Sequence, residues 1–158
     1  NYAVVIVNVW EMIITRQKDI LGTLRGLSGY VVIVPVPLYG RRERERGFNQ
    51  AKILADCFLK IISERFPEIK WTVSDKYLKR TRQTAQQAKL SKAEREKNIF
   101  GAFGAGEVIL DKTIILIDDV FTTGATLDEC ARVLKQAGAR EVWGLTLARS
   151  LSIDVTNV

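Results

Sequence analysis

Short apolar runs alternate with longer segments of helical periodicity along most of the chain. The apolar and largely β-branched runs predict strands at residues 4–9, 30–34, 72–78, 99–103, 113–117 and 141–147. Apolar residues three and four positions apart predict helices at residues 18–27, 48–66 and 126–137. Strands that alternate with helices are typical of a parallel sheet, so we expect an α/β fold.

Two of the predicted helices have clear apolar faces. The helix at 48–66 is expected to turn inward the side chains of Ile53, Leu54, Cys57, Phe58, Ile61 and Ile62. The helix at 126–137 is expected to bury Leu127, Cys130, Ala131 and Leu134, and Gly138 is expected to end it.

The most informative segment is residues 114–126, which read Ile-Ile-Leu-Ile-Asp-Asp-Val-Phe-Thr-Thr-Gly-Ala-Thr. Its apolar start predicts a central strand buried on both faces. Asp118 and Asp119 follow at the carboxyl end of that strand, where open α/β sheets bind ligands. Residues 122–126 then offer hydroxyls and backbone N–H groups at a helix N-terminus, which suits a phosphate. Because carboxylates accept hydrogen bonds from sugar hydroxyls, the segment predicts a site for a 5-phosphorylated ribose.

Three other interpretations compete for this segment. Walker-B strands also end in Asp-Asp, but they need an upstream G-x-x-x-x-G-K-[ST] motif, which this sequence lacks. A phospho-acceptor receiver domain would place most of its length after such a pair, and 39 residues follow Asp119. Threonines that merely cap a helix would not explain the acidic pair.

Residues 40–47, Gly-Arg-Arg-Glu-Arg-Glu-Arg-Gly, form a second candidate site between a predicted strand and a predicted helix. Glycines and guanidinium groups together could hold an anionic ligand. A solvated turn, in which Glu43 and Glu45 neutralise two arginines, explains the composition equally well. The acidic segment favours the anion site, because in a small sheet both loops should face one crevice.

The net charge of +6 is concentrated in residues 76–98, which contain eight basic and two acidic side chains. Such a segment attracts a diphosphate or a nucleic acid backbone. Residues 78–90 are long and polar for an ordinary connection, so we expect a basic lid over an anion. A solvated, disordered loop is the alternative.

The chain contains no histidine and two cysteines, Cys57 and Cys130. Metal sites with histidine ligands and Ser-His or Cys-His nucleophile pairs are therefore excluded, and a divalent ion bound by oxygen ligands would be Mg²⁺. Both cysteines are expected to be buried thiols in a reducing compartment, which favours a cytoplasmic location. No apolar run is long enough for a membrane span, and residues 1–10 are not expected to be a signal peptide.

The segment 114–126 resembles the PRPP (phosphoribosyl diphosphate) signature of type I phosphoribosyltransferases. A wider set of motifs over about residues 30–150 resembles the ComF family, whose members have a predicted phosphoribosyltransferase fold and are linked to competence for DNA uptake. Those motifs are Pro-Val-Pro-Leu (35–38), Arg-Gly-Phe-Asn-Gln (46–50), Leu-Lys-Arg-Thr-Arg-Gln-Thr-Ala-Gln-Gln (78–87), Arg95, Asn98, Gly-Ala-Phe (101–103), the Asp-Asp-Val loop and Ala148-Arg149. Many family members also carry an N-terminal four-cysteine zinc module, for which this sequence lacks the cysteines.

The resemblance implies a parallel-sheet type I phosphoribosyltransferase fold, with residues 1–29 as a minimal hood, 30–150 as the core and 151–158 as a tail. It implies that PRPP's ribose and 5-phosphate contact Asp118, Asp119, Val120, Phe121, Thr122, Thr123, Gly124, Ala125 and Thr126. It assigns the diphosphate to Pro37, Leu38, Arg41, Arg46 and Gly47. It assigns a flexible loop to Arg82, Thr84, Gln87, Arg95 and Asn98, and adds Lys79 and Arg80 to the acidic pair as catalytic residues.

The resemblance also implies that Mg²⁺ arrives with PRPP. No side chain is expected to ligate the ion directly, although Asp118 and Asp119 could reach it through water. An enzyme of this kind would displace diphosphate from the anomeric carbon with a nitrogen nucleophile, whose identity the sequence leaves open. The alternatives are a non-catalytic DNA-uptake protein that binds single-stranded DNA or PRPP, and a PRPP-sensing regulator. A homodimer is also expected.

Overall fold

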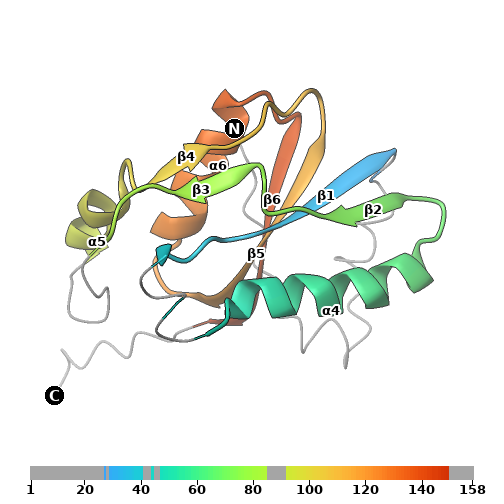
Figure 1. Cartoon of the computed structure of the whole chain (residues 1–158), viewed down its shortest axis with the longest axis horizontal. Coiled ribbons are helices and arrows are strands. Elements are labelled where there is room, and N and C mark those ends of the chain that lie inside the picture. Colours follow the sequence, from blue (N-terminus) through green and yellow to red (C-terminus); the bar gives the residue numbers. More distant parts are fainter. Residues whose placement is uncertain (1–26, 28, 41–43, 45–46, 85–91, 150–158) are drawn as a thin grey trace, which may run out of the picture.

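A computed structural model describes residues 27, 29–40, 44, 47–84 and 92–149 of the chain. Its centre is a parallel four-stranded sheet with the strand order β2-β1-β5-β6 (Figure 1). The strands are β1 (Tyr30–Pro35), β2 (Lys70–Val73), β5 (Thr113–Phe121) and β6 (Glu141–Arg149). The expected parallel α/β sheet is therefore confirmed.

Helices cover both faces of this sheet (Figure 1). The helix α4 (Gln50–Arg65) connects β1 to β2 and packs on one face, and α6 (Ala125–Gln136) connects β5 to β6 and packs on the other. Alternate residues of β5 supply both cores, since Ile115 and Ile117 pack with α4 while Ile114 and Leu116 pack with α6. The strand is apolar on both faces because both faces are covered.

A small hairpin lies against the α6 side of the sheet. It pairs β3 (Leu78–Arg80) antiparallel with β4 (Phe103–Ala105), and the helix α5 (Lys92–Ile99) precedes β4. Figure 1 shows α5 beyond one end of the hairpin, away from the main sheet. The strands β3 and β4 pair with each other, and α5 lies between them in the sequence. We call the described residues from β3 to β4, including α5, the arm.

Several predicted boundaries change in the structure. The predicted strand 72–78 divides into β2 and β3, and the predicted strand 99–103 is replaced by the end of α5, a turn and the start of β4. The basic segment expected to be a lid instead begins as β3 and resumes as α5, while residues 85–91 lie outside the described part. Strand β5 runs four residues further than expected, so that it includes the acidic pair.

The cysteine prediction is half right. Cys130 is buried in α6, whereas Cys57 is exposed on α4. The buried residues of α4 are Ala51, Ala55, Phe58 and Ile62, while Ile53 and Ile61 are exposed. The two alanines take the positions nearest the sheet, which turns Cys57 toward solvent.

The predicted strand at 4–9 and most of the predicted helix at 18–27 lie outside the described residues. The division into a hood, a core and a tail therefore stays a prediction. Among the helices that the structure describes, none combines the length and apolar character of a membrane-spanning segment.

Candidate functional site

A cavity of about 280 Å³ opens at the carboxyl edge of the sheet. The segments that line it are residues 36–38, 49–51, 118–122, 124 and 126–127, together with Arg80 and Thr84. At this edge β1 ends at Pro35, which is paired to Ile117, while β5 continues to Phe121. The Val36 N–H donates to the Ile117 carbonyl at 2.9 Å, so the chain leaves β1 beside the acidic pair. The acidic segment thus shares a cavity with residues 36–38, which precede the second candidate site, whereas Gly40, Arg44 and Gly47, the described residues of that second site, do not line it.

The acidic pair lies on the last residues of β5 and lines this cavity. The Asp119 backbone N–H donates to Asp118 Oδ1 at 2.9 Å, which orients the first carboxylate. Burial raises the pKa of Asp118 to about 7, and the neighbouring Asp119 carboxylate adds to the rise. The hydrogen bond from the Asp119 N–H and the Arg80 guanidinium act in the opposite direction. A ligand that donates hydrogen bonds to Asp118 would favour its ionised form.

The loop after the acidic pair leads directly into the N-terminus of α6. Gly124 is the N-cap residue and adopts a left-handed conformation with φ of 87°, which a glycine tolerates best. Gly124 has no side chain to cap the helix, and the Ala125 N–H donates to Thr123 Oγ1 at the long distance of 3.5 Å. The helix N-terminus therefore presents backbone N–H groups and a partial positive charge to the cavity, an arrangement that attracts anions.

Seven of the nine residues assigned to the ribose phosphate line the cavity: Asp118, Asp119, Val120, Phe121, Thr122, Gly124 and Thr126. The other two, Thr123 and Ala125, do not appear in its wall, and the Ala125 side chain belongs to the core under α6. They can contribute through the backbone.

The loop assigned to the diphosphate is only partly described. Pro37 and Leu38 line the cavity beside the acidic pair. Gly47 is exposed with φ of 77° and lies outside the lining, while Arg41 and Arg46 fall outside the described residues. The described part of this loop therefore reaches the site through Pro37 and Leu38.

The two basic residues predicted to be catalytic lie on different walls. Arg80 lines the cavity, donates from Nη2 to Thr84 Oγ1 at 2.5 Å and stacks over the Phe103 ring at 5.2 Å. Lys79 is exposed and lines an adjacent hollow of about 250 Å³ instead, with Lys52 and Asp75 on its wall. Successive side chains alternate along a strand, so only one of two neighbours can face the main cavity.

Arg82 is held by the protein's own backbone rather than directed at the cavity. Its Nη2 donates to the carbonyls of Asn98 at 2.8 Å and of Phe100 at 2.9 Å. Arg82 and Asn98 were assigned to a flexible loop, and these contacts join the two residues at the base of the arm. Arg95 lies on α5 outside the cavity wall, and Gln87 is not described.

Glu129 connects the arm to α6. Its carboxylate is buried, accepts the Gly101 N–H at 2.8 Å and receives two bonds from Arg132, at 2.7 and 2.8 Å. The bonds from Arg132 lower the pKa of Glu129. The Arg132 guanidinium also stacks over Phe100 at 5.3 Å. The arm that carries Arg80 and Thr84 is thus attached to the helix whose N-terminus forms the site.

Asn49 is the main site residue that the sequence predictions omitted. It is the N-cap of α4, where its Oδ1 accepts the Ala51 N–H at 3.0 Å, and its Nδ2 donates to the Val36 carbonyl at 3.1 Å. It joins the start of α4 to the loop after β1. An asparagine directly before an amphipathic helix is the signal that could have identified it.

The oxygen atoms of this cavity could bind a hard cation only together with ligands from a bound molecule and from water. No group of three or more metal-ligating side chains occurs within the described residues. Two carboxylates and the threonine hydroxyls are donors that suit Mg²⁺, which commonly binds through one or two carboxylates, substrate phosphates and water. The residues present therefore fit an ion that a phosphorylated ligand brings with it.

A profile of the family described as "Phosphoribosyl transferase domain" matches residues 45–152. The chain belongs to this family. The matched range begins in the loop before α4 and contains the acidic pair, the threonine loop and the arm. The type I phosphoribosyltransferase fold expected from the sequence is therefore confirmed.

Curated relatives confirm the resemblance to the ComF family. The chain is 35% identical to "Competence protein F" of Haemophilus influenzae over 121 residues, which cover 73% of this chain and 50% of that protein. It is 36% identical to "DNA utilization protein YhgH" of Escherichia coli K12 over 119 residues, covering 75% and 49%. It is 39% identical to "Competence protein ComFC" of Bacillus subtilis over 124 residues, covering 77% and 45%. The chain spans about half the length of these relatives.

Proposed function

We propose that the cavity at the carboxyl edge of the sheet binds PRPP through its 5-phosphorylated ribose. The observation that carries the proposal is that one cavity contains both carboxylates, the N-terminus of α6 with its N-cap Gly124, the start of the loop after β1 and Arg80. Carboxylates suit the ribose 2- and 3-hydroxyls, and the helix N-terminus suits the 5-phosphate.

The other groups of the cavity fit the rest of this ligand. Arg80 and the backbone at Pro37 and Leu38 would face the diphosphate, and the resemblance adds Arg41, Arg46 and Gly47. Mg²⁺ bound to the diphosphate oxygens would neutralise their charge, with Asp118 and Asp119 reaching the ion through water.

The same geometry would support transfer of the ribosyl group. The bond between the anomeric carbon and the diphosphate oxygen would break, with its electron pair leaving on the diphosphate. A nitrogen of the acceptor would form the new bond and then lose its proton to solvent. Fixing the ribose and the leaving group in one cavity is how such a site would lower the barrier without a covalent intermediate.

Isothermal titration calorimetry tests the proposed ligand. We expect PRPP with Mg²⁺ to bind, ribose 5-phosphate to bind more weakly, and diphosphate alone to bind weakest, because the acidic pair and the helix N-terminus both face the sugar. Absence of binding heat with PRPP, or diphosphate binding as tightly as PRPP, would contradict the assignment. Diphosphate release, screened over a panel of nucleobases and other nitrogen acceptors, tests transfer.

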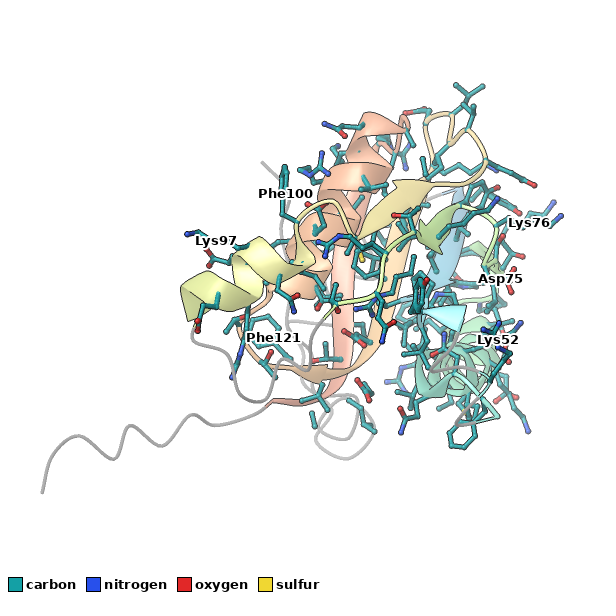
Figure 2. The ribbon with its side chains drawn as sticks, turned by 60° about the vertical axis from the view of Figure 1, so that its left-hand side comes forward. Lys52, Asp75, Lys76, Lys97, Phe100 and Phe121 are labelled. Carbon is teal, nitrogen blue, oxygen red and sulfur yellow. The ribbon has the colours of Figure 1, made fainter. Side chains whose placement is uncertain are left out.

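A second candidate function is binding of single-stranded DNA on the arm. Phe100 is 66% exposed at the end of α5, with the Arg132 guanidinium over its ring and Lys97 one turn before it (Figure 2). An exposed aromatic ring beside cations suits stacking on a base and contact with phosphates. Figure 2 also shows Lys76 at the opposite end of the molecule from Lys97, so these two lysines of the basic segment lie far apart.

Fluorescence anisotropy with a labelled oligothymidylate at two salt concentrations tests this candidate. We expect Phe100→Ala and Lys97→Gln each to weaken binding, the second with a smaller salt dependence. Lys60→Gln, on the exposed side of α4, is the matched control. Equal affinity in all four proteins would remove the candidate.

A further inference from the structure

The hydroxyl of Thr146 is a buried polar group at the edge of the candidate site. Thr146 is 1% exposed, and its Oγ1 has no hydrogen-bond partner among the residues that the structure describes. A buried hydroxyl without a partner lowers the stability of the folded protein, because it has lost its hydrogen bonds to water. Valine has the same shape without that cost, so this threonine requires an explanation.

The strand register places Thr146 beside the acidic pair. Thr146 of β6 is paired directly with Asp118 of β5. Val142 of β6 and Leu116 of β5 both belong to the core under α6. Since side chains alternate along a strand, Thr146 and Asp118 lie on that same face of the sheet. Neighbouring strands lie about 4.8 Å apart, so side chains of directly paired residues on one face are within reach of a hydrogen bond.

The Asp118 carboxylate can accept more hydrogen bonds than the one that the described residues give it through the Asp119 N–H. Asp118 Oδ1 accepts the Asp119 N–H, Arg80 approaches from β3, and the buried thiol of Cys130 lies on α6 above the same face. An ionised carboxylate has about four lone-pair sites, so it can accept a further donor while it accepts sugar hydroxyls. A hydroxyl beneath the carboxylate would hold it in one rotamer.

We propose that Thr146 is a positioning residue for the ligand, and that its hydroxyl donates to the Asp118 carboxylate when that carboxylate holds the ribose. This inference rests on the proposed function, because it assigns Thr146 a part in the same site. The unpaired hydroxyl is then a cost of the free protein that ligand binding relieves. Thr146 does not line the cavity, so it acts through Asp118 alone.

The test compares Thr146→Val with Thr146→Ser by calorimetry with PRPP and Mg²⁺. A hydrogen bond to a charged group contributes about 1.5–3 kcal/mol, so the valine variant should bind about tenfold or more weakly. Its thermal unfolding temperature should be equal to or higher than that of the wild type, because a buried unpaired hydroxyl is gone. Thr146→Ser should recover most of the affinity.

A matched control separates this role from a structural one. Thr113 is a fully buried threonine at the other end of β5, and its Oγ1 accepts a bond from Arg140 at 2.9 Å. Thr113→Val should lower stability and leave PRPP affinity unchanged. Thr146→Val in an Asp118→Asn background should cause a smaller loss of affinity if the hydroxyl acts through that carboxylate, because a neutral amide oxygen accepts more weakly than a carboxylate.

The outcomes distinguish the two proposals. A wild-type protein that binds PRPP, with a valine variant of equal affinity or a serine variant as weak as valine, would overturn the role of Thr146 and leave the proposed function standing. An undiminished effect in the Asp118→Asn background would do the same. A wild-type protein that does not bind PRPP would overturn both.

Discussion

Glu129 of α6 is hydrogen-bonded to Gly101 of the arm and to Arg132, and we call these contacts the bracket. Replacing Glu129 with glutamine tests whether the bracket contributes to the stability of the protein. The substitution keeps the shape of the side chain and one carbonyl oxygen for the Gly101 N–H, but it removes the charge and turns an N–H₂ group toward Arg132. Hydrogen bonds to charged groups contribute about 1.5–3 kcal/mol each. Because the Arg132 side chain is 36% exposed, solvent screening places the expected loss near the low end, at about 1–2 kcal/mol.

Chemical denaturation at several pH values measures this loss. The pKa of Glu129 is lowered from its usual 4.5, chiefly by the bonds from Arg132. A lowered folded-state pKa gives stability that is present above the pKa of the unfolded chain and disappears as the pH falls through the folded-state pKa. The difference between wild type and Glu129→Gln should therefore be full at pH 7 and shrink below about pH 4.

Hydrogen exchange adds a local measurement to the global one. The Gly101 amide should lose protection in Glu129→Gln, because its acceptor becomes a neutral amide oxygen. Glu64→Gln, an exposed carboxylate on α4, is the matched control and should change stability by no more than about 0.5 kcal/mol. If Glu129→Gln unfolds like this control at pH 7 and Gly101 exchanges as in the wild type, the bracket does not stabilise the arm.

Three further predictions concern the site and the cysteines. Gly124→Ala places a Cβ on backbone with φ of 87°, so it should cost about 1–2 kcal/mol in denaturant unfolding and weaken PRPP binding; unchanged unfolding would show that the turn relaxes. Asn49→Ala removes the cap of α4 and should cost about 1 kcal/mol, measured in the same way, and a loss below 0.3 kcal/mol would contradict the cap. Cys57 should react with a thiol reagent in the native protein while Cys130 reacts only after unfolding, and equal native rates would contradict the burial of Cys130.

The raised pKa of Asp118 leads to a prediction for ligand binding as well as for stability. Since its pKa is raised from 3.8 to about 7, Asp118 adds to folding stability at low pH and loses that contribution as the pH rises through 7. Sugar hydroxyls donate to the ionised form, so PRPP should bind more tightly at pH 8 than at pH 6. Asp118→Asn should retain only the part of this change that comes from the ligand's own phosphates, and an identical pH profile in both proteins would contradict the prediction.

The sequence predicted the central part of the fold because burial there follows chain periodicity. Residues 114–117 are apolar on both faces and became the middle of β5, and the inward residues of α6 were those with helical spacing. Strand β5 nevertheless continues through the acidic pair, since β6 pairs with it as far as Arg149. That extension depends on a partner strand that the local pattern cannot show.

The arm was the part that periodicity could not predict. Strand β3 has three residues, too few for an alternation to show, and α5 is almost wholly polar, with Ile99 as its one aliphatic residue larger than alanine. Its alanine, glutamate, lysine and arginine residues are good helix formers, which was the available signal. The separation of Lys79 from Arg80 likewise follows from strand geometry, which appears once the hairpin is known.

The grouping of the candidate site residues follows chain order in one part of the cavity wall and long-range contacts in the arm. The acidic pair and the threonine loop are contiguous in sequence and became contiguous in the cavity wall. Arg82 was assigned to a flexible loop, and its partners are carbonyls 16 and 18 residues away. The pattern of residues near Arg82 in the sequence cannot predict hydrogen bonds to carbonyls so far along the chain.

The central claim is that a phosphorylated ribose binds between the acidic pair and the N-terminus of α6. An NMR titration with PRPP and Mg²⁺ tests it most directly, since backbone amide shifts report where the ligand lies. The account predicts the largest shifts at the amides of residues 119–127, their loss in an Asp118→Asn/Asp119→Asn variant, and their retention in Asp111→Asn, at the opposite end of β5. Shifts that cluster on the arm instead, or that persist in the double variant, would contradict it.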